Sequence, residues 1–274
     1  MNGSMISAMA SMSGLQQKLD MLADNIANVD TVGYKRKVGT FEDLLTTLKQ
    51  QPDAFKQPGR LTPMGFNQGW GSRLTMVQPD MAQGPLKETD QPYDVAIEGN
   101  ALFQVTVDDA GHTGYTRGGS FQTTFTNMGI NILTTKEGYP VASVNGGSIE
   151  IPAEVQSNVR IDASGNVIGT TPAGDILQLG QVKLVQVDKP GLLTQVSDNL
   201  FTVADGVQVG DVMHDVTASA ESKIAIKQGY LEQSNVVLAD EMTDLISVQR
   251  AYQLSGRALT SSDTMMGLAN NLRA

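Results

Sequence analysis

The sequence contains no cysteine among its 274 residues, and this absence excludes several kinds of site. Without thiols the chain can form no disulfide, bind no metal through thiolate and use no cysteine nucleophile. Aromatic residues are also scarce, at 5% of the chain with the single tryptophan Trp70.

Basic residues are in short supply as well. The chain has 19 Lys and Arg residues and 29 Asp and Glu residues, which gives a net charge of −10. Nucleic-acid-binding domains carry a basic patch and polybasic anchors need clustered cations, so we expect no nucleic-acid partner and no such anchor. No run reaches the ~18 apolar residues that cross a bilayer, so no membrane insertion is expected. The first basic residue is Lys18 and no apolar segment precedes it, so no cleaved signal peptide is expected.

The candidates for catalytic and metal-binding residues have simpler structural explanations. His112 and His214 are far apart in the sequence, and no G-x-S-x-G motif marks a nucleophile. The acidic pair Asp108-Asp109 stands in a turn sequence, and Asp240-Glu241 stands in the first turns of an expected helix, where negative charge suits the helix dipole. The calcium-like sequence at 162–166 lacks an acidic residue at its twelfth position, and no Gly-rich phosphate loop is present. We therefore expect no catalytic residue, no metal site, no cofactor and no enzymatic activity.

Apolar side chains recur at helical spacing near the N-terminus. Steps of three and four residues place them on one stripe of a helix. We expect this helix to end near Asn28, because turn residues follow and Gly33 can adopt a positive φ. The stripe consists of Met5, Met9, Met12, Leu15, Leu19, Leu22 and Ile26.

A longer stripe with similar spacing lies near the C-terminus. Its helix is expected to begin near Ser234-Asn235, and the repeat continues for about four heptads, as in coiled coils. Two stripes at opposite ends of one chain favour packing against each other and against further copies. The stripe consists of Leu238, Met242, Leu245, Val248, Tyr252, Ser255, Leu259, Ser262, Met266 and Ala269.

The middle of the chain has a different pattern. Dense Pro and Gly between residues 34 and 92 predict an extended or loop-like stretch, with one or two helical turns expected at 41–45. From Asp94 onward apolar residues alternate with polar ones between turn sequences, which predicts an antiparallel β domain, either a sandwich or a barrel. The expected strands include 95–97, 103–107, 115–125, 131–134, 139–144, 182–187 and 200–203.

Motifs at both ends of the chain resemble a known family. The sequence LADNIANVDTVGYKR at Leu22–Arg36 resembles the A-N-N-I-A-N-x-x-T-x-G-[YF] signature of bacterial flagellar axial proteins of the rod and hook. Near the C-terminus, Gly229–Val236 resembles the family's G-x-L-E-x-S-N-V motif, and Glu241–Tyr252 resembles its E-M-x-x-L-I-x-x-Q-R-A-Y block. Further agreement in the middle lies at 94–99, 115–117, 119–121 and 199–201. The resemblance therefore spans nearly the whole chain.

The resemblance implies an α+β fold and a structural role. Residues 1–30 and 231–274 would form a helical, coiled-coil assembly domain. Residues 31–92 would be an extended linker and assembly stretch, and residues 93–230 a mainly antiparallel β outer domain. The subunit would self-assemble into the helical rod of the flagellar basal body, outside the cytoplasmic membrane, and transmit motor torque to the hook. Its partners would be itself, other rod and hook subunits and the flagellar type III export apparatus.

The stripes and the motifs together predict the residues that pack subunits against one another. Length and the stretch before Asp94 resemble the distal-rod members most closely. The alternatives are a proximal-rod or hook-type axial subunit and, from a different class, a secreted β-sandwich module that binds or hydrolyses cell-wall glycan. The predicted packing residues are Met5, Met9, Met12, Leu15, Leu19, Leu22, Asn25, Ile26, Asn28, Gly33, Tyr34, Leu238, Met242, Leu245, Val248, Gln249, Arg250, Tyr252, Leu259 and Met266.

Overall fold

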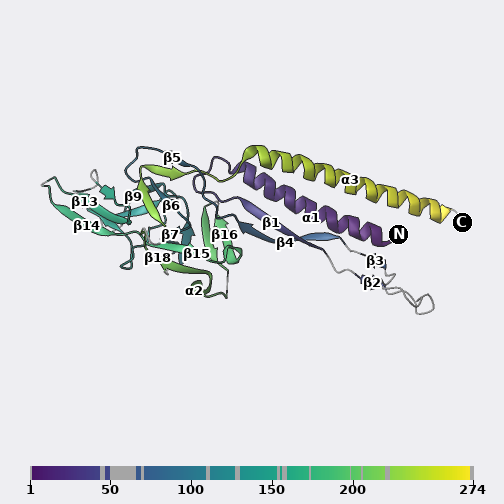
Figure 1. Cartoon of the computed structure of the whole chain (residues 1–274), viewed down its shortest axis with the longest axis horizontal. Helices are drawn as coiled ribbons and strands as arrows, with labels where there is room; N and C mark the ends of the chain where they lie inside the picture. Colours follow the sequence, from purple (N-terminus) through teal and green to yellow (C-terminus); the bar gives the residue numbers. More distant parts are fainter. Residues whose placement is uncertain are drawn as a thin grey trace, which may run out of the picture. The chain divides into compact units, whose positions relative to one another are not determined.

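The computed structural model divides the chain into two compact units (Figure 1). The first unit is formed by Met1–Asp24, Val38–Val77 and Ala239–Ala274, and the second by Asn25–Lys37 and Gln78–Leu238. The structure describes residues 2–43, 47–49, 66–68, 71–108, 112–126, 130–152, 155, 159–172, 174–197, 199–204, 206–219 and 223–271.

The first unit contains most of two long helices, α1 (Asn2–Ala27) and α3 (Leu238–Asn271), which run side by side in Figure 1. At ~1.5 Å per residue, the 34 residues of α3 extend over about 51 Å. The predicted end of the first helix near Asn28 is confirmed. The predicted start of the second at Ser234-Asn235 is three to four residues too early, because the Asn235 side chain bonds to the backbone of residues 36, 80 and 82.

Strands β1 (Lys37–Asp43) and β4 (Ser72–Pro79) pair with each other, and their first-unit residues pack on one face of α1. The packing is close, since a Cβ on Gly14 would lie 3.1 Å from the Ser72 carbonyl oxygen and 3.6 Å from the Phe41 ring. Because β1 extends to Asp43, the helical turns predicted at 41–45 are wrong for residues 41–43. Residues 44 and 45 lie outside the described residues.

The expected extended stretch at 34–92 contains short strands. In the first unit, β2 (Thr47–Lys49) pairs antiparallel with β3 (Phe66–Gln68). The Pro- and Gly-rich residues 50–65, on which much of that expectation rested, lie outside the described residues.

Antiparallel sheets build the second unit, as the sequence predicted. The largest sheet has the order β16-β17-β8-β7-β15-β18, made of Leu193–Ser197, Leu200–Val203, Thr113–Thr116, Leu102–Thr106, Leu184–Val187 and Met213–Val216. Two three-stranded sheets are β11-β10-β9 (Glu150–Ile151, Asn131–Thr135, Phe121–Phe125) and β12-β13-β14 (Val159–Ile161, Asn166–Thr170, Ile176–Gln181). Two strand pairs are β6 with β19 (Val95–Glu98, Ala225–Gln228) and β5 with β20 (Leu86–Glu88, Tyr230–Glu232). A short 3-10 helix at Pro190–Leu192 and α2 (Val209–Val212) complete the unit.

Two expected strands differ from the structure. The run 115–125 divides into β8 and β9, because the chain passes so close to β6 at Gly119 that a Cβ there would lie 1.6 Å from the Val95 oxygen. The run 139–144 forms isolated bridges instead of a strand. The periodicity of a sequence does not show where another segment passes close by, so the division of 115–125 into two strands could not be predicted.

The largest sheet of the second unit lies between two apolar clusters. Successive side chains of a strand point to opposite faces. On β7, Leu102 belongs to one cluster while Phe103 belongs to the other, and on β15 Val185 and Leu184 divide in the same way. Phe103 also meets Phe121 edge to face, with ring centroids 5.0 Å apart. The second unit therefore has a core of its own on each side of the sheet.

Gly33 turns the chain after α1. Its φ of 72° is in the left-handed region, and its N–H donates to the Glu232 backbone oxygen over 2.8 Å. A Cβ at this position would lie 2.5 Å from the backbone nitrogen of Gly118. Both the conformation and the space therefore require glycine.

We expect Gly33→Ala to destabilise the chain far more than Gly174→Ala. Both glycines have positive φ, but a Cβ on Gly174 would meet nothing within 4 Å. Gly174→Ala should therefore lower the free energy of unfolding by only about 1 kcal/mol, the strain alone. The clash at Gly33 should raise the loss to about 3 kcal/mol or more. Urea unfolding followed by circular dichroism measures both, and equal losses would contradict the steric argument.

Candidate functional site

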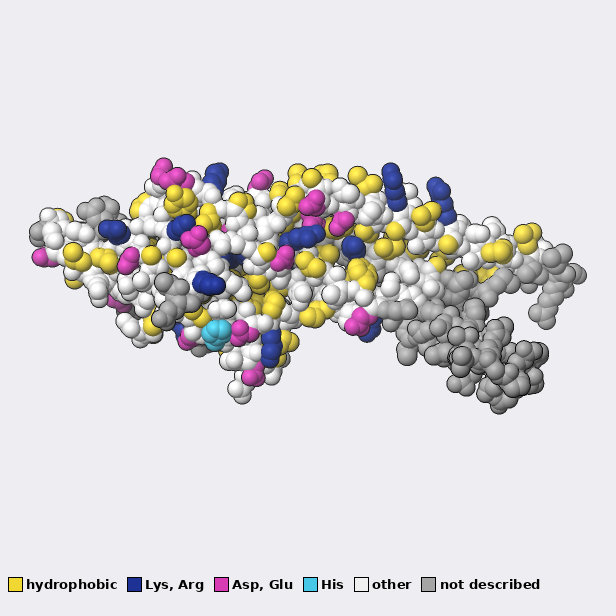
Figure 2. Space-filling model, in the orientation of Figure 1, with side chains coloured by type: hydrophobic (Ala, Val, Ile, Leu, Met, Phe, Trp, Pro, Cys, Tyr) yellow, Lys and Arg dark blue, Asp and Glu magenta, His cyan; other side chains and the backbone are white. Residues whose placement is uncertain are grey.

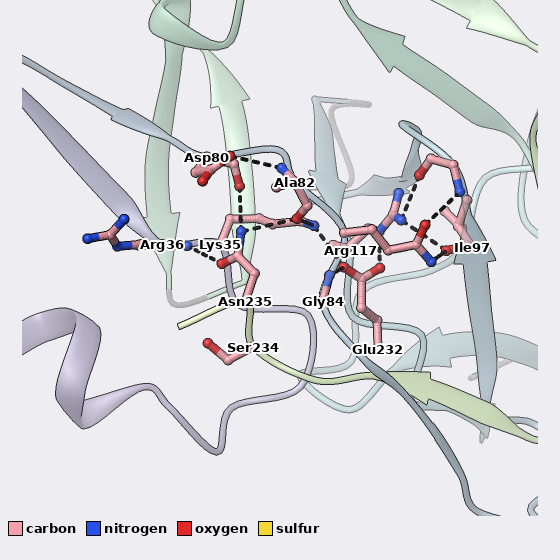
Figure 3. Close-up of polar contacts among 12 residues, drawn as sticks. Lys35, Arg36, Asp80, Ala82, Gly84, Ile97, Arg117, Glu232, Ser234 and Asn235 are labelled. Carbon is pink, nitrogen blue, oxygen red and sulfur yellow. Dashed lines mark hydrogen bonds and ion pairs between the residues drawn. The ribbon is translucent and has the colours of Figure 1, made fainter. Parts of the chain in front are cut away.

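Three buried charged side chains meet inside the second unit (Figure 3). Lys35 follows α1, Arg117 follows β8 and Glu232 ends β20. The Lys35 Nζ lies 2.7 Å from Glu232 Oε1, and the Arg117 Nε lies 2.5 Å from Glu232 Oε2. Their side chains are only 1–2% exposed. We call Lys35, Arg117 and Glu232 the ionic cluster.

Backbone groups complete the hydrogen bonding of the ionic cluster. The Lys35 ammonium donates to the Ala82 oxygen over 2.8 Å, and the Gly84 N–H donates to Glu232 Oε1 over 2.9 Å. Arg117 donates to the oxygens of residues 97, 99 and 101. Buried charges are tolerated only when paired and hydrogen-bonded, and this arrangement meets both conditions.

The ionic cluster has two cations and one carboxylate, so one positive charge lacks an anionic partner within it. Burial lowers the pKa of Lys35, and the nearby Arg117 charge lowers it further, against the opposing effects of Glu232 and, more weakly, Asp80. Burial also lowers the pKa of Arg117, again opposed by Glu232. A folded-state pKa of Lys35 below the unfolded value means that the unfolded chain binds more protons there, so stability rises with pH between the two values.

Asn235 extends the contact between the N- and C-terminal sides of the unit. Its Oδ1 accepts the Arg36 N–H over 2.7 Å, and its Nδ2 donates to the Asp80 and Ala82 oxygens over 3.0 and 3.1 Å. The segment that leads into α3 is thereby bonded to the segment that follows α1 (Figure 3).

Asn25 substitutes for a strand partner at the start of β1. Its Nδ2 donates to the Lys37 oxygen over 3.1 Å, and its Oδ1 accepts the Lys37 N–H over 2.9 Å. The Tyr34 hydroxyl donates to the same Oδ1 over 3.2 Å. Asn25 and Tyr34, which the sequence suggested as subunit-packing residues, therefore have buried partners within the chain.

The predicted packing residues divide into three groups by exposure. Leu22, Asn25, Gly33, Tyr34 and Val248 are buried. Half-buried are Met5, Met12, Leu15, Leu19, Ile26, Asn28, Leu245, Tyr252, Leu259 and Met266. Exposed are Met9, Leu238, Met242, Gln249 and Arg250.

Helix α3 also carries exposed apolar side chains that the predicted stripe omits. The stripe from Leu245 to Met266 is the less exposed face of the helix. Figure 2 shows apolar side chains along the visible outer face of α3. Those on α3 that are at least 42% exposed are Leu238, Met242, Ile246, Leu254, Met265 and Leu268. A helix this apolar on two faces is typical of one that has further helical neighbours.

Two kinds of site are absent from the described residues. No group of three or more His, Asp or Glu among them could hold a metal ion, and no described helix is long and apolar enough to span a bilayer. His112 pairs with Asp108 and His214 pairs with Asp188, both at exposed positions. The sequence did not predict the ionic cluster. All three members lie in segments that resemble the family, but they are up to 197 residues apart and no spacing pattern joins them.

Sequence comparisons give three family matches. The model of the flagella basal body rod protein matches residues 5–35, that of the flagellar hook protein FlgE/F/G D1 domain matches 96–169, and that of the flagellar basal body rod FlgEFG protein C-terminal matches 227–272.

Full-length relatives agree. The chain is 32% identical to the flagellar basal-body rod protein FlgG of Borreliella burgdorferi, covering 97% of each. It is 36% identical to FlgG of Agrobacterium fabrum, covering 96% of each. It is 32% identical to the flagellar hook-basal body complex protein FlhP of Bacillus subtilis, covering 98% of this chain and 99% of that one.

Substitutions in the ionic cluster should differ in their effect on stability according to the net charge that they leave buried. Glu232→Gln leaves two buried cations without a carboxylate and should cost about 3–5 kcal/mol of unfolding free energy. Lys35→Met leaves the Arg117–Glu232 pair balanced and should cost clearly less. Chemical denaturation of the full chain measures both.

A matched control is the exposed pair of Lys227 and Glu98, whose Nζ and Oε2 are 3.1 Å apart. Lys227→Met should change the unfolding free energy by less than about 1 kcal/mol, because exposed ion pairs contribute little. If Lys35→Met lowered the unfolding free energy as much as Glu232→Gln, the net charge left in the ionic cluster would not explain the stability of the variants.

Proposed function

This chain belongs to the flagellar basal-body rod FlgEFG family as a FlgG-like axial subunit, and from that premise we propose how it assembles. We propose that it polymerises with copies of itself and other axial subunits into a helical, distal-rod-type structure that carries torque from motor to hook. The family is structural and non-enzymatic, and its place is the basal-body rod. The alternative of a glycan-binding module or hydrolase finds no support in the full-length relatives, which are flagellar basal-body rod and hook-basal body complex proteins.

The apolar side chains left exposed on α1 and α3 are the observation that carries this proposal. Met9 on α1 and Met242 on α3 are both at least half exposed. Burying a large apolar side chain contributes about 1.5–3 kcal/mol, so repeated helix contacts between copies can drive assembly. Contacts between different surfaces of identical subunits generate a helical filament when the rotation from one subunit to the next does not close a ring.

We assign the parts of the chain accordingly. Residues 1–30 and 231–274 act as the assembly domain, 31–92 as a connecting assembly stretch and 93–230 as the outer β domain. The ionic cluster and Asn235 join these three parts, since they fix residues 33–36 and 232–235 onto the β sheets of the second unit. Load entering through either terminal segment then reaches the β domain through buried bonds. Delivery through the flagellar type III apparatus, without a cleaved signal, is part of the same proposal.

The proposal predicts that Met242→Glu prevents rod assembly without unfolding the monomer. Met242 is 50% exposed, so a glutamate there remains solvated in the free chain but would be buried against a neighbour. Ser247→Glu, at another exposed position of α3, is the matched control. Losing one apolar contact and burying a charge should reduce rod-containing basal bodies at least about tenfold, since 1.4 kcal/mol is a factor of ten.

Electron microscopy of basal bodies from cells that produce each variant counts the rods, and circular dichroism checks the monomer fold. Normal rod numbers with Met242→Glu would contradict the role given to this face of α3. Equal loss with Ser247→Glu would show that added charge anywhere on the helix blocks assembly, and would contradict it as well.

A further inference from the structure

All the sulfur of this chain is in methionine, and more than half of it lies on the two long helices. The chain has 13 methionines and no cysteine. Four methionines are on α1 and three on α3, although these helices contain only 26 and 34 of the 274 residues. Any reversible sulfur chemistry of this chain is therefore that of a thioether. The helix methionines are Met5, Met9, Met12, Met21, Met242, Met265 and Met266.

Three of these side chains are at least half exposed. Met9 is 58% exposed, Met242 50% and Met265 52%. By contrast, Met21 on α1 and Met213 in β18 are only 8% and 1% exposed. A small oxidant in solution reaches the first three side chains directly, but it reaches the other two only after the structure opens locally. We call Met9, Met242 and Met265 the exposed helix methionines.

Peroxide converts a methionine thioether into a sulfoxide. The sulfur lone pair attacks one peroxide oxygen, the O–O bond breaks, and the products are the sulfoxide and one molecule of water. Methionine sulfoxide reductases reverse the change, because a dithiol supplies two electrons and two protons, becomes a disulfide and releases the oxygen as water. Since this chain has no cysteine, no thiol of its own competes for the oxidant.

Oxidation changes what the exposed helix methionines can pack against. A flexible apolar side chain becomes a polar one. At an exposed position of the free chain the sulfoxide oxygen stays hydrated, so the monomer keeps its fold. Against an apolar surface of a neighbouring copy, the same oxygen would lose its water without gaining a hydrogen-bond donor, which is unfavourable. Oxidation therefore weakens contacts between copies more than it weakens the fold.

We propose that Met9, Met242 and Met265 are oxidation sites at which peroxide keeps a free subunit out of the rod and sulfoxide reduction readmits it. The inference rests on the proposed function, because it needs neighbouring copies to cover these side chains in the rod. Assembled subunits are protected, since the contacts that require the apolar thioether also exclude the oxidant. The sites thus act before a subunit is incorporated, while they face water.

Peroxide treatment of the purified full chain, followed by mass spectrometry, tests the assignment of the sites. The exposed helix methionines should be oxidised at least about ten times faster than Met21 and Met213, because the buried side chains react only after local opening. In isolated rods the same three residues should react at least about tenfold more slowly than in the monomer. Equal rates in monomer and rods would overturn the proposal.

Rod formation by the oxidised chain, counted by electron microscopy, tests the consequence. Oxidised native chain should form at least about tenfold fewer rods than untreated chain, and methionine sulfoxide reductases with a dithiol should restore the number. The triple variant Met9→Leu, Met242→Leu and Met265→Leu keeps apolar side chains of similar volume and should form rods equally well with and without peroxide. Met76→Leu, which removes an exposed methionine of β4, is the matched control and should leave the native sensitivity unchanged.

The outcomes separate this proposal from the proposed function. Unchanged rod numbers after oxidation of the native chain, or an equal loss in the triple leucine variant, would overturn the methionine proposal and leave the rod function intact. Protection by Met76→Leu would overturn it too, because the sensitive site would then lie on β4. Failure of the untreated native chain to form rods would overturn the proposed function itself.

Glutamine substitution gives an independent measurement that needs no oxidant. Glutamine is unbranched like methionine and has a similar helix propensity, but it carries a polar amide in place of the thioether. In cells, the triple variant Met9→Gln, Met242→Gln and Met265→Gln should give at least about tenfold fewer rods than the triple leucine variant. Equal rod numbers for the two variants would contradict the idea that polarity at these positions blocks assembly.

Discussion

A single carboxylate, that of Glu232, sits between two buried cations, and the geometry of the second unit depends on it. Lys35 and Arg117 can remain charged away from water only because this carboxylate and a set of backbone oxygens surround them. Residues 35 and 232 are 197 positions apart, so their contact joins the two ends of the β domain. Closing so long a loop has an entropic cost, which the bonds of the ionic cluster help to offset.

The same carboxylate fixes the register in which β20 pairs with β5. Strand β20 pairs with β5 so that Leu231 lies opposite Lys87 and Glu232 opposite Leu86. A slip by one residue would turn Glu232 away and present Leu231 to the two cations. Buried ion pairs are weak evidence for net stability but are known to select one register over another. In this chain the selected register also sets where the segment before α3 begins, so the register of β20 sets the starting point of the C-terminal helix.

The sequence was sufficient for features that depend on local periodicity. The stripe from Leu245 to Met266 predicted the less exposed face of α3, and alternation from Asp94 onward predicted antiparallel strands. Features that depend on distant neighbours were not accessible. Gly119 interrupts a run that reads as one strand because β6 passes against it. Glu232 is a motif residue in the sequence, but nothing in the sequence shows that folding brings Lys35 and Arg117 beside it.

The two units differ in how they bury their apolar and charged side chains. The β domain has apolar clusters on both faces of its main sheet, and its buried charges are paired. The long helices keep apolar side chains in contact with water, on α3 from Leu238 to Leu268. Exposed apolar surface of that extent is unfavourable in an isolated chain and becomes favourable when copies cover it. Under the proposed function, the exposed apolar side chains of α3 are a surface that further copies would cover, and they recur along the length of the helix. The β domain also exposes apolar side chains, Phe125 and Ile176 among them, but it has its own apolar clusters and the ionic cluster to hold its fold.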